Sequence, residues 1–72
     1  MNETEKKMLE YLQGLIDAHK QYKETYNKEH FEIDYESAKM YLERFFACAN
    51  MFYCVTGKNV SIRNWKATII EE

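Results

Sequence analysis

The longest apolar pattern lies in the middle of the chain and predicts a helix over 35–56. When these residues are placed at steps of about 100° around a helix axis, the apolar side chains fill an arc of about 180°. A surface helix with one neighbour needs an apolar stripe of little more than about 100°. We therefore expect this helix to have two packing partners, with Phe45 and Phe52 facing another helix of the same chain.

The first segment predicts a second helix over 4–27, because its apolar positions recur at alternating spacings of four and three. This rhythm is typical of a helix that packs along its length on another helix. Gly14 lies outside the stripe, and we interpret it as a tolerated residue that costs about 1 kcal/mol relative to alanine. The positions that carry the rhythm are Met8, Leu12, Leu15, His19, Tyr22 and Tyr26.

The segment 28–34 interrupts the helical rhythm and predicts an extended connection, because Phe31 and Ile33 alternate with a glutamate. Asp34 is suited to cap the start of the following helix, and Gly57 is suited to the left-handed position after its last turn. The two helices, of about 24 and 22 residues, match in length at about 1.5 Å per residue. An antiparallel hairpin of two long helices requires such a match.

The last segment, 61–71, predicts a short third helix. Ser61 can act as its N-cap, and Val60 and Trp65 then occupy the two positions of a hydrophobic staple. The predicted fold class is therefore all-α, an antiparallel hairpin of two long helices plus a short C-terminal helix.

A strand is the alternative for this segment. Val60 and Ile62 alternate with polar residues, and residues 68–70 are β-branched, as is common in strands.

Length and charge narrow the classes of protein to which the chain can belong. Its 72 residues predict a single helical domain, 1–72, whose small core needs a disulfide, a metal or a second subunit for additional stability. The net charge of −2, with acids and bases interleaved, argues against a large surface for nucleic acid. No signal peptide or membrane-spanning run is visible, so we expect a cytoplasmic protein with reduced thiols and no membrane partner.

The residues that could carry chemistry form no catalytic or ligand-binding pattern. Cys48 and Cys54 lie about 9 Å apart along one helix, which is beyond the reach of about 7 Å that a disulfide tolerates. His19 and His30 could join them as zinc ligands, but neither spacing fits a zinc motif. We therefore predict no enzymatic activity, no cofactor and no metal, and we interpret His19 as a core histidine bonded to a tyrosine.

The surplus of apolar residues favours a role in protein interaction, since aromatic residues and methionine are enriched at interfaces. A two-fold homodimer is the commonest closed assembly. Our hypothesis is a non-enzymatic helical module that forms a homodimer and binds or inhibits another protein. Its small size would suit an accessory factor of a phage or mobile element. The predicted interface residues are Met40, Phe46, Met51, Tyr53 and Trp65.

The alternative hypothesis is a small DNA-binding transcriptional regulator that uses residues 61–70. A helix, a turn at Gly57 and a further helix loosely resemble a helix-turn-helix layout, in which Arg63, Asn64 and Lys66 would face the major groove. The spacing departs from the usual motif and the chain is acidic, so we favour a docking role for this segment.

Overall fold

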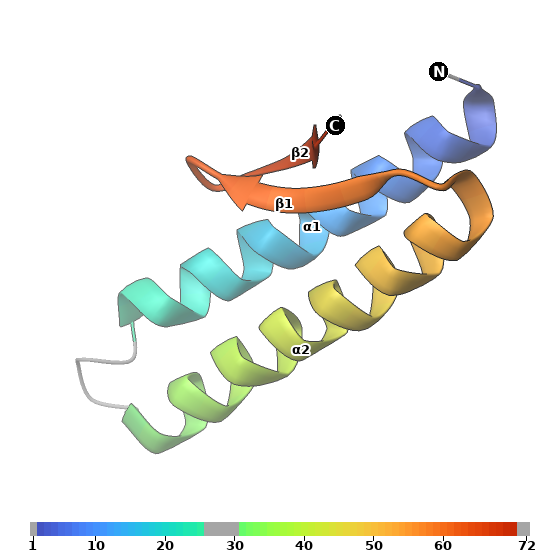
Figure 1. Cartoon of the computed structure of the whole chain (residues 1–72). Coiled ribbons are helices and arrows are strands. Elements are labelled where there is room, and N and C mark those ends of the chain that lie inside the picture. The colour runs from blue at the N-terminus through green and yellow to red at the C-terminus, as the bar shows by residue number, and fades with distance from the viewer. Residues whose placement is uncertain (1, 26–30, 71–72) are drawn as a thin grey trace.

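Two antiparallel helices followed by a β-hairpin make up the described structure (Figure 1). The structure is a computed structural model that describes residues 2–25 and 31–70. The antiparallel pair of long helices confirms that part of the predicted fold class. The elements are α1 (Glu3–Thr25), α2 (Phe31–Thr56), β1 (Asn59–Arg63) and β2 (Lys66–Ile70).

The first helix starts at an asparagine cap. Asn2 Oδ1 accepts a hydrogen bond of 2.8 Å from the backbone N–H of Glu5, and the Asn2 carbonyl accepts one of 3.0 Å from Lys6. The side-chain bond satisfies a backbone donor that a helix start leaves without a partner, and the bond from Lys6 is the first hydrogen bond of the helix itself. The observed helix begins at Glu3, one residue before the start of the predicted helix 4–27. Residues 26 and 27 of that prediction lie outside the described part of the chain, as does His30.

The second helix begins earlier than the sequence pattern indicated. Phe31–Asp34 form its first turn, so the extended connection predicted over 28–34 is wrong for these four residues, and Asp34 is not a cap. An alternation over three residues is too short to distinguish an extended segment from a helical turn. The predicted end is confirmed: α2 stops at Thr56, and Gly57 has a positive φ of 73°. Its N–H donates a 2.7 Å hydrogen bond to the carbonyl of Tyr53.

The third helix predicted over 61–71 is wrong, because the segment forms an antiparallel hairpin. Its strand alternative is confirmed. Ser61 pairs with Thr68 across the hairpin and caps no helix. The two-residue turn Asn64–Trp65 has φ values of 52° and 61°, which is the type I′ pattern that matches the twist of hairpin strands. The strand pattern prevails because a period of two places one apolar face against the helices. This face contains Val60, Ile62, Ala67 and Ile69.

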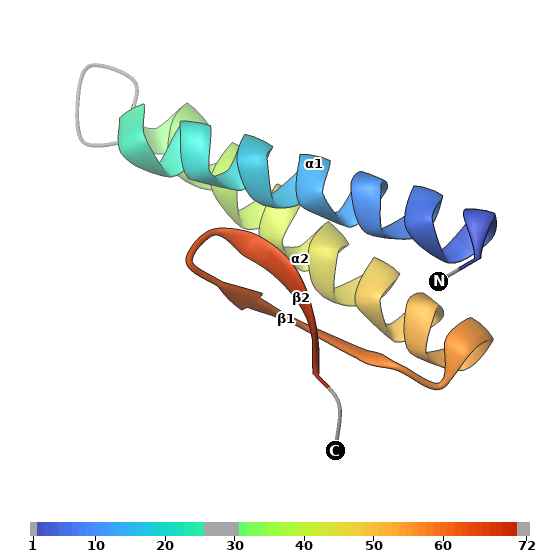
Figure 2. The ribbon, with the colours of Figure 1, turned by 90° about the horizontal axis from the view of Figure 1, so that it is seen from above.

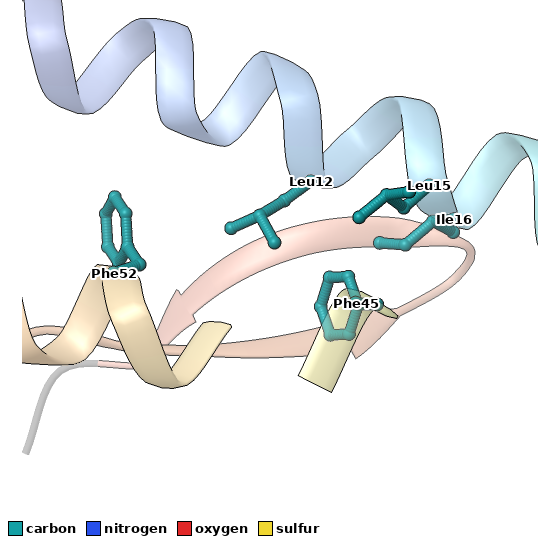
Figure 3. Packing of buried hydrophobic residues seen from close by; sticks show 5 residues of the cluster. All are labelled: Leu12, Leu15, Ile16, Phe45 and Phe52. Atoms are coloured by element: carbon teal, nitrogen blue, oxygen red, sulfur yellow. The ribbon is translucent and has the colours of Figure 1, made fainter. Parts of the chain in front are cut away.

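The core lies between the two helices and is closed on one side by the hairpin (Figures 2 and 3). Phe45 and Phe52 are 1% and 0% exposed and face α1, which confirms the expectation for these two rings. The side chains that α1 contributes are Leu12, Leu15 and Ile16.

Two polar contacts fasten the hairpin to α1. The Gln13 side chain donates to the Trp65 carbonyl at 3.0 Å and accepts from the Ala67 N–H at 2.8 Å, so one amide binds both the turn and the start of β2. Lys58, which links α2 to β1, forms a 3.0 Å ion pair with Glu5. The hairpin is therefore held to α1 at its turn and close to its first strand.

Candidate interaction surfaces

The C-terminal half of α2 presents an exposed face without charged residues. No Asp, Glu, Lys or Arg occurs from Phe45 to Gly57. Within this stretch Phe46 is 55% exposed, Met51 60% and Val55 61%, although their neighbours Phe45 and Phe52 are buried. We call the exposed set the charge-free face; it comprises Phe46, Ala47, Asn50, Met51, Tyr53, Cys54 and Val55.

The predicted interface residues on α2 are all exposed but point to two flanks. Phe46 and Tyr53 are seven residues apart and share one flank, since a helix has about 3.6 residues per turn. Met51 follows Phe46 by five residues and lies about 140° away, on the same line as Met40. The charge-free face therefore wraps around the outward half of the helix, and Met40 lies beyond its end among charged residues.

Trp65, the fifth predicted interface residue, is separate from this face. It lies in the hairpin turn, and its ring packs against His19 of α1 with a centre-to-centre distance of 6.0 Å. The residues of the DNA-binding alternative are its neighbours along the chain: Asn64 shares the turn, Arg63 ends β1 and Lys66 begins β2. No recognition helix carries them, so the helix-turn-helix layout is wrong.

An apolar groove opens between the two helices beside the charge-free face. Its volume is about 330 Å³, and Met51 belongs to both surfaces. Gln13 of α1 faces the hairpin, because it bonds to Ala67. Tyr11 in the groove wall lies two residues earlier, which is about 200° around the helix, so the groove is on the flank away from the hairpin. Sequence reasoning missed this groove because its α1 wall combines two residues of the apolar stripe, Met8 and Leu12, with side chains beside the stripe. The lining residues are Thr4, Lys7, Met8, Tyr11, Leu12, Cys48 and Met51.

His19 has a structural contact that explains its place in the apolar stripe. Its Nδ1 lies 2.7 Å from the carbonyl oxygen of Ala38, and because a carbonyl only accepts, Nδ1–H donates. The acceptor is thus a backbone carbonyl of α2 and not a tyrosine. Within the described residues, no three His, Cys, Asp or Glu side chains come close enough to hold a metal ion. Cys48 and Cys54 are both free thiols.

Comparisons with known proteins provide no relative from which a function can be transferred. No protein-family model matches the chain, and no curated protein or solved structure is significantly similar to it. Among the described helices, none combines the length and the apolar character needed to cross a membrane.

Proposed function

We propose that this chain is a non-enzymatic helical module that assembles into a homodimer through the charge-free face of α2 and binds another protein. The observation that carries the proposal is the uninterrupted uncharged stretch from Phe45 to Gly57, whose outward side chains are exposed within one chain. A soluble monomer rarely exposes a large contiguous apolar surface, and such surfaces mark interaction sites.

A second copy of the chain is the occupant that fits this face best. Among the described residues only six hydrophobic side chains are buried, so the core leaves much of the stabilisation to an additional interface. A standard interface buries about 800 Å² per partner, which is about one seventh of the 5449 Å² surface of this chain. An uncharged surface is also complementary to itself, as a two-fold axis requires.

The central position of Asn50 supports an antiparallel crossing of the two α2 helices. Asn50 is the exposed amide of the face, and across a two-fold axis it can hydrogen-bond to its own copy and fix the register. Ala47 and Cys54 lie about one turn before and after Asn50 on the same face, and these two small side chains allow close approach of the helix backbones.

The groove between α1 and α2 is the surface that remains for a different protein. Its apolar walls suit an inserted apolar side chain, and Lys7 in the lining suits an acidic group beside it. We infer that the bound partner presents an amphipathic helix with an acidic residue near its apolar anchor.

The test of the dimer compares the same substitution at two exposed asparagines. Asn50→Lys introduces a charge into the centre of the charge-free face, whereas Asn59→Lys introduces it at the start of the hairpin. Lysine favours a helix more than asparagine does, so Asn50→Lys does not disfavour α2 itself. Two like charges facing each other across an interface cost several kcal/mol. We expect the dimer dissociation constant to rise by about 100-fold for Asn50→Lys only.

Sedimentation equilibrium at micromolar to tens of micromolar concentrations measures this change. Circular dichroism at the same concentrations verifies that both variants keep their helices. A wild-type chain that is strictly monomeric in this range, or an equal loss of assembly in both variants, would contradict the proposal.

A further inference from the structure

The hairpin turn places a bulky residue where the backbone normally requires glycine. Type I′ turns prefer Asn-Gly, because both central residues have positive φ. Here the second position is Trp65, with a φ of 61°, a region that residues with a Cβ rarely adopt. Such outliers persist where the surrounding structure holds them, and they cluster at functional sites.

The strands next to the turn carry a second local conflict. Arg63 and Lys66 are directly paired in the register, and like charges opposite each other are unfavourable. From α1, Lys20 and Lys23 place their amino nitrogens 5.7 and 5.5 Å from the centre of the Trp65 ring. Two cations of α1 thus lie over the aromatic ring, and two more, Arg63 and Lys66, flank the turn at the ends of the strands. We call this set the basic tip; it comprises Lys20, Lys23, Arg63 and Lys66 around Trp65.

The acids of this part of α1 offset the charge of the basic tip only in part, because two acids lie near its four cations. Asp17 accepts a hydrogen bond from Gln13 at 3.0 Å, and Glu24 forms only a 4.0 Å exposed contact with Lys20. Exposed charges beyond about 10 Å are largely screened at physiological salt, so the net charge of the whole chain matters less here than these near neighbours.

The backbone and the ring of Trp65 are both contacted by α1, and two of the α1 residues at the ring, His19 and Lys23, also line a small cavity. Gln13 binds the carbonyl of Trp65 and the N–H of Ala67, and His19 packs on the ring while its Nδ1 is bonded to the Ala38 carbonyl of α2. A cavity of about 190 Å³ adjoins these contacts, since it shares two residues with them. Its lining adds another lysine and a tyrosine; the residues are His19, Lys23, Tyr35, Ala38, Lys39 and Leu42.

We propose that the basic tip binds single-stranded nucleic acid, independently of the dimerisation and groove described above. An unpaired base stacks on Trp65, and the lysines and Arg63 bind the flanking phosphates. An exposed aromatic ring combined with several cations is the combination that single strands recognise, since every base offers a face for stacking. A duplex hides these faces, and an acidic peptide offers no base to stack on Trp65.

The single tryptophan of the chain makes this binding directly measurable. A single strand of about twelve nucleotides should quench the fluorescence of Trp65, and a labelled strand should gain anisotropy. Each phosphate contact contributes about −0.7 to the slope of log affinity against log salt, so four contacts predict a slope of about −3. Absence of both signals at low salt, or equal affinity for a duplex of the same sequence, would overturn the proposal.

Substitutions separate the aromatic from the ionic contribution. Trp65→Gly removes the ring but places the preferred residue in the type I′ turn, so a folded hairpin is retained. Stacking on an aromatic residue is strong enough that its loss should weaken binding of the labelled strand by about tenfold. If this variant instead binds the strand as tightly as the wild type, the stacking role is wrong.

A matched pair of lysines tests the position of the charge. Lys23→Gln should reduce the salt slope by about 0.7, whereas Lys6→Gln, which changes the same charge near the other end of α1, should leave it unchanged. Equal losses would indicate general charge attraction and overturn the site. Inorganic polyphosphate serves as the ligand without bases. If it competes as well as the single strand does, the proposal fails.

Discussion

The inward and outward faces of α2 have similar apolar composition but opposite environments. Phe45 is 1% exposed and packs against α1, whereas the next residue, Phe46, is 55% exposed. In one chain only the inward rings contribute to the core, since burial is what makes apolar surface stabilising. The apolar residues on the inward side of this helix contribute to folding, whereas those on the outward side form the exposed surface to which we assign the proposed association.

The two flanks of the helix pair show the same contrast. The hairpin covers one flank and is fastened by Gln13, while the other flank remains open as the groove beside Tyr11 and Met51. Within residues 2–25 and 31–70, the hairpin is the one element that covers the helix pair, and it lies on one flank. The open flank and the charge-free face are continuous, because Met51 belongs to both.

The largest expected effect comes from alanine at the two adjacent phenylalanines. Phe45→Ala should lower the free energy of unfolding by about 3–5 kcal/mol, because it leaves a cavity in the core. For a domain of this size that is most of the total stability. Phe46→Ala, on the exposed face, should change the unfolding of the monomer by less than about 0.5 kcal/mol.

Urea unfolding at two protein concentrations measures both variants and separates folding from assembly. We expect the stability of the Phe46→Ala chain to depend less on concentration than that of the wild type. Similar losses for both variants at low concentration would show that the inward and outward faces do not differ as described.

An intermediate effect is expected when the hydrogen bonds that hold the hairpin to α1 are removed. Gln13→Leu removes the acceptor of the Ala67 N–H and should cost about 1–3 kcal/mol. Gln13→Glu is the matched variant, because it keeps an acceptor for Ala67 but loses the donor to the Trp65 carbonyl. Amide hydrogen exchange of β2 should accelerate more in Gln13→Leu than in Gln13→Glu. Unchanged exchange in both would mean that the hairpin is held by its apolar face alone.

The sequence predicted the two helices and their inward faces because these depend on local periodicity. Residues three and four apart share a side of a helix regardless of the rest of the fold. The rhythm of Leu12 and Leu15 and the place of Phe45 and Phe52 were therefore readable. The end of α2 was also predictable from a local signal, because glycine is favoured at positions where φ is positive, and Gly57 occupies such a position.

The hairpin could not be predicted from local signals, since its segment satisfies two patterns at once. Ser61 and Trp65 fit a helix start, and Val60 and Ile62 fit a strand. The choice is made by packing on helices already formed, and by Gln13, which is more than fifty residues away from its partner Ala67 along the chain. The turn also lacks the usual Asn-Gly signal, because Trp65 takes the place of glycine.

The candidate surfaces were predictable only as a surplus of apolar residues. The sequence indicated that α2 has more apolar surface than one neighbour covers, and Phe46, Met51 and Tyr53 are indeed exposed in this chain. It could not indicate that Trp65 belongs to a different surface, because that separation depends on the hairpin.

The smallest expected effect tests whether assembly belongs to α2 alone. Gly14 lies on the exposed side of α1, and a Cβ added there meets nothing within 4 Å. Gly14→Ala should therefore raise stability by about 0.5–1 kcal/mol, because alanine loses less backbone entropy in a helix. Gly57→Ala is the control with the opposite sign, since its φ of 73° strains any residue with a Cβ.

Gly14→Ala also tests the dimer, because an added methyl group at Gly14 would weaken assembly only if another helix packed closely against this side of α1. With the charge-free face on α2 as the contact, thermal unfolding of Gly14→Ala should shift upward while sedimentation equilibrium gives an unchanged dissociation constant. A weaker dimer in this more stable chain would place α1 in the interface, as GxxxG-like close approaches do elsewhere. The contrast between the two faces of α2 would then describe folding but not assembly.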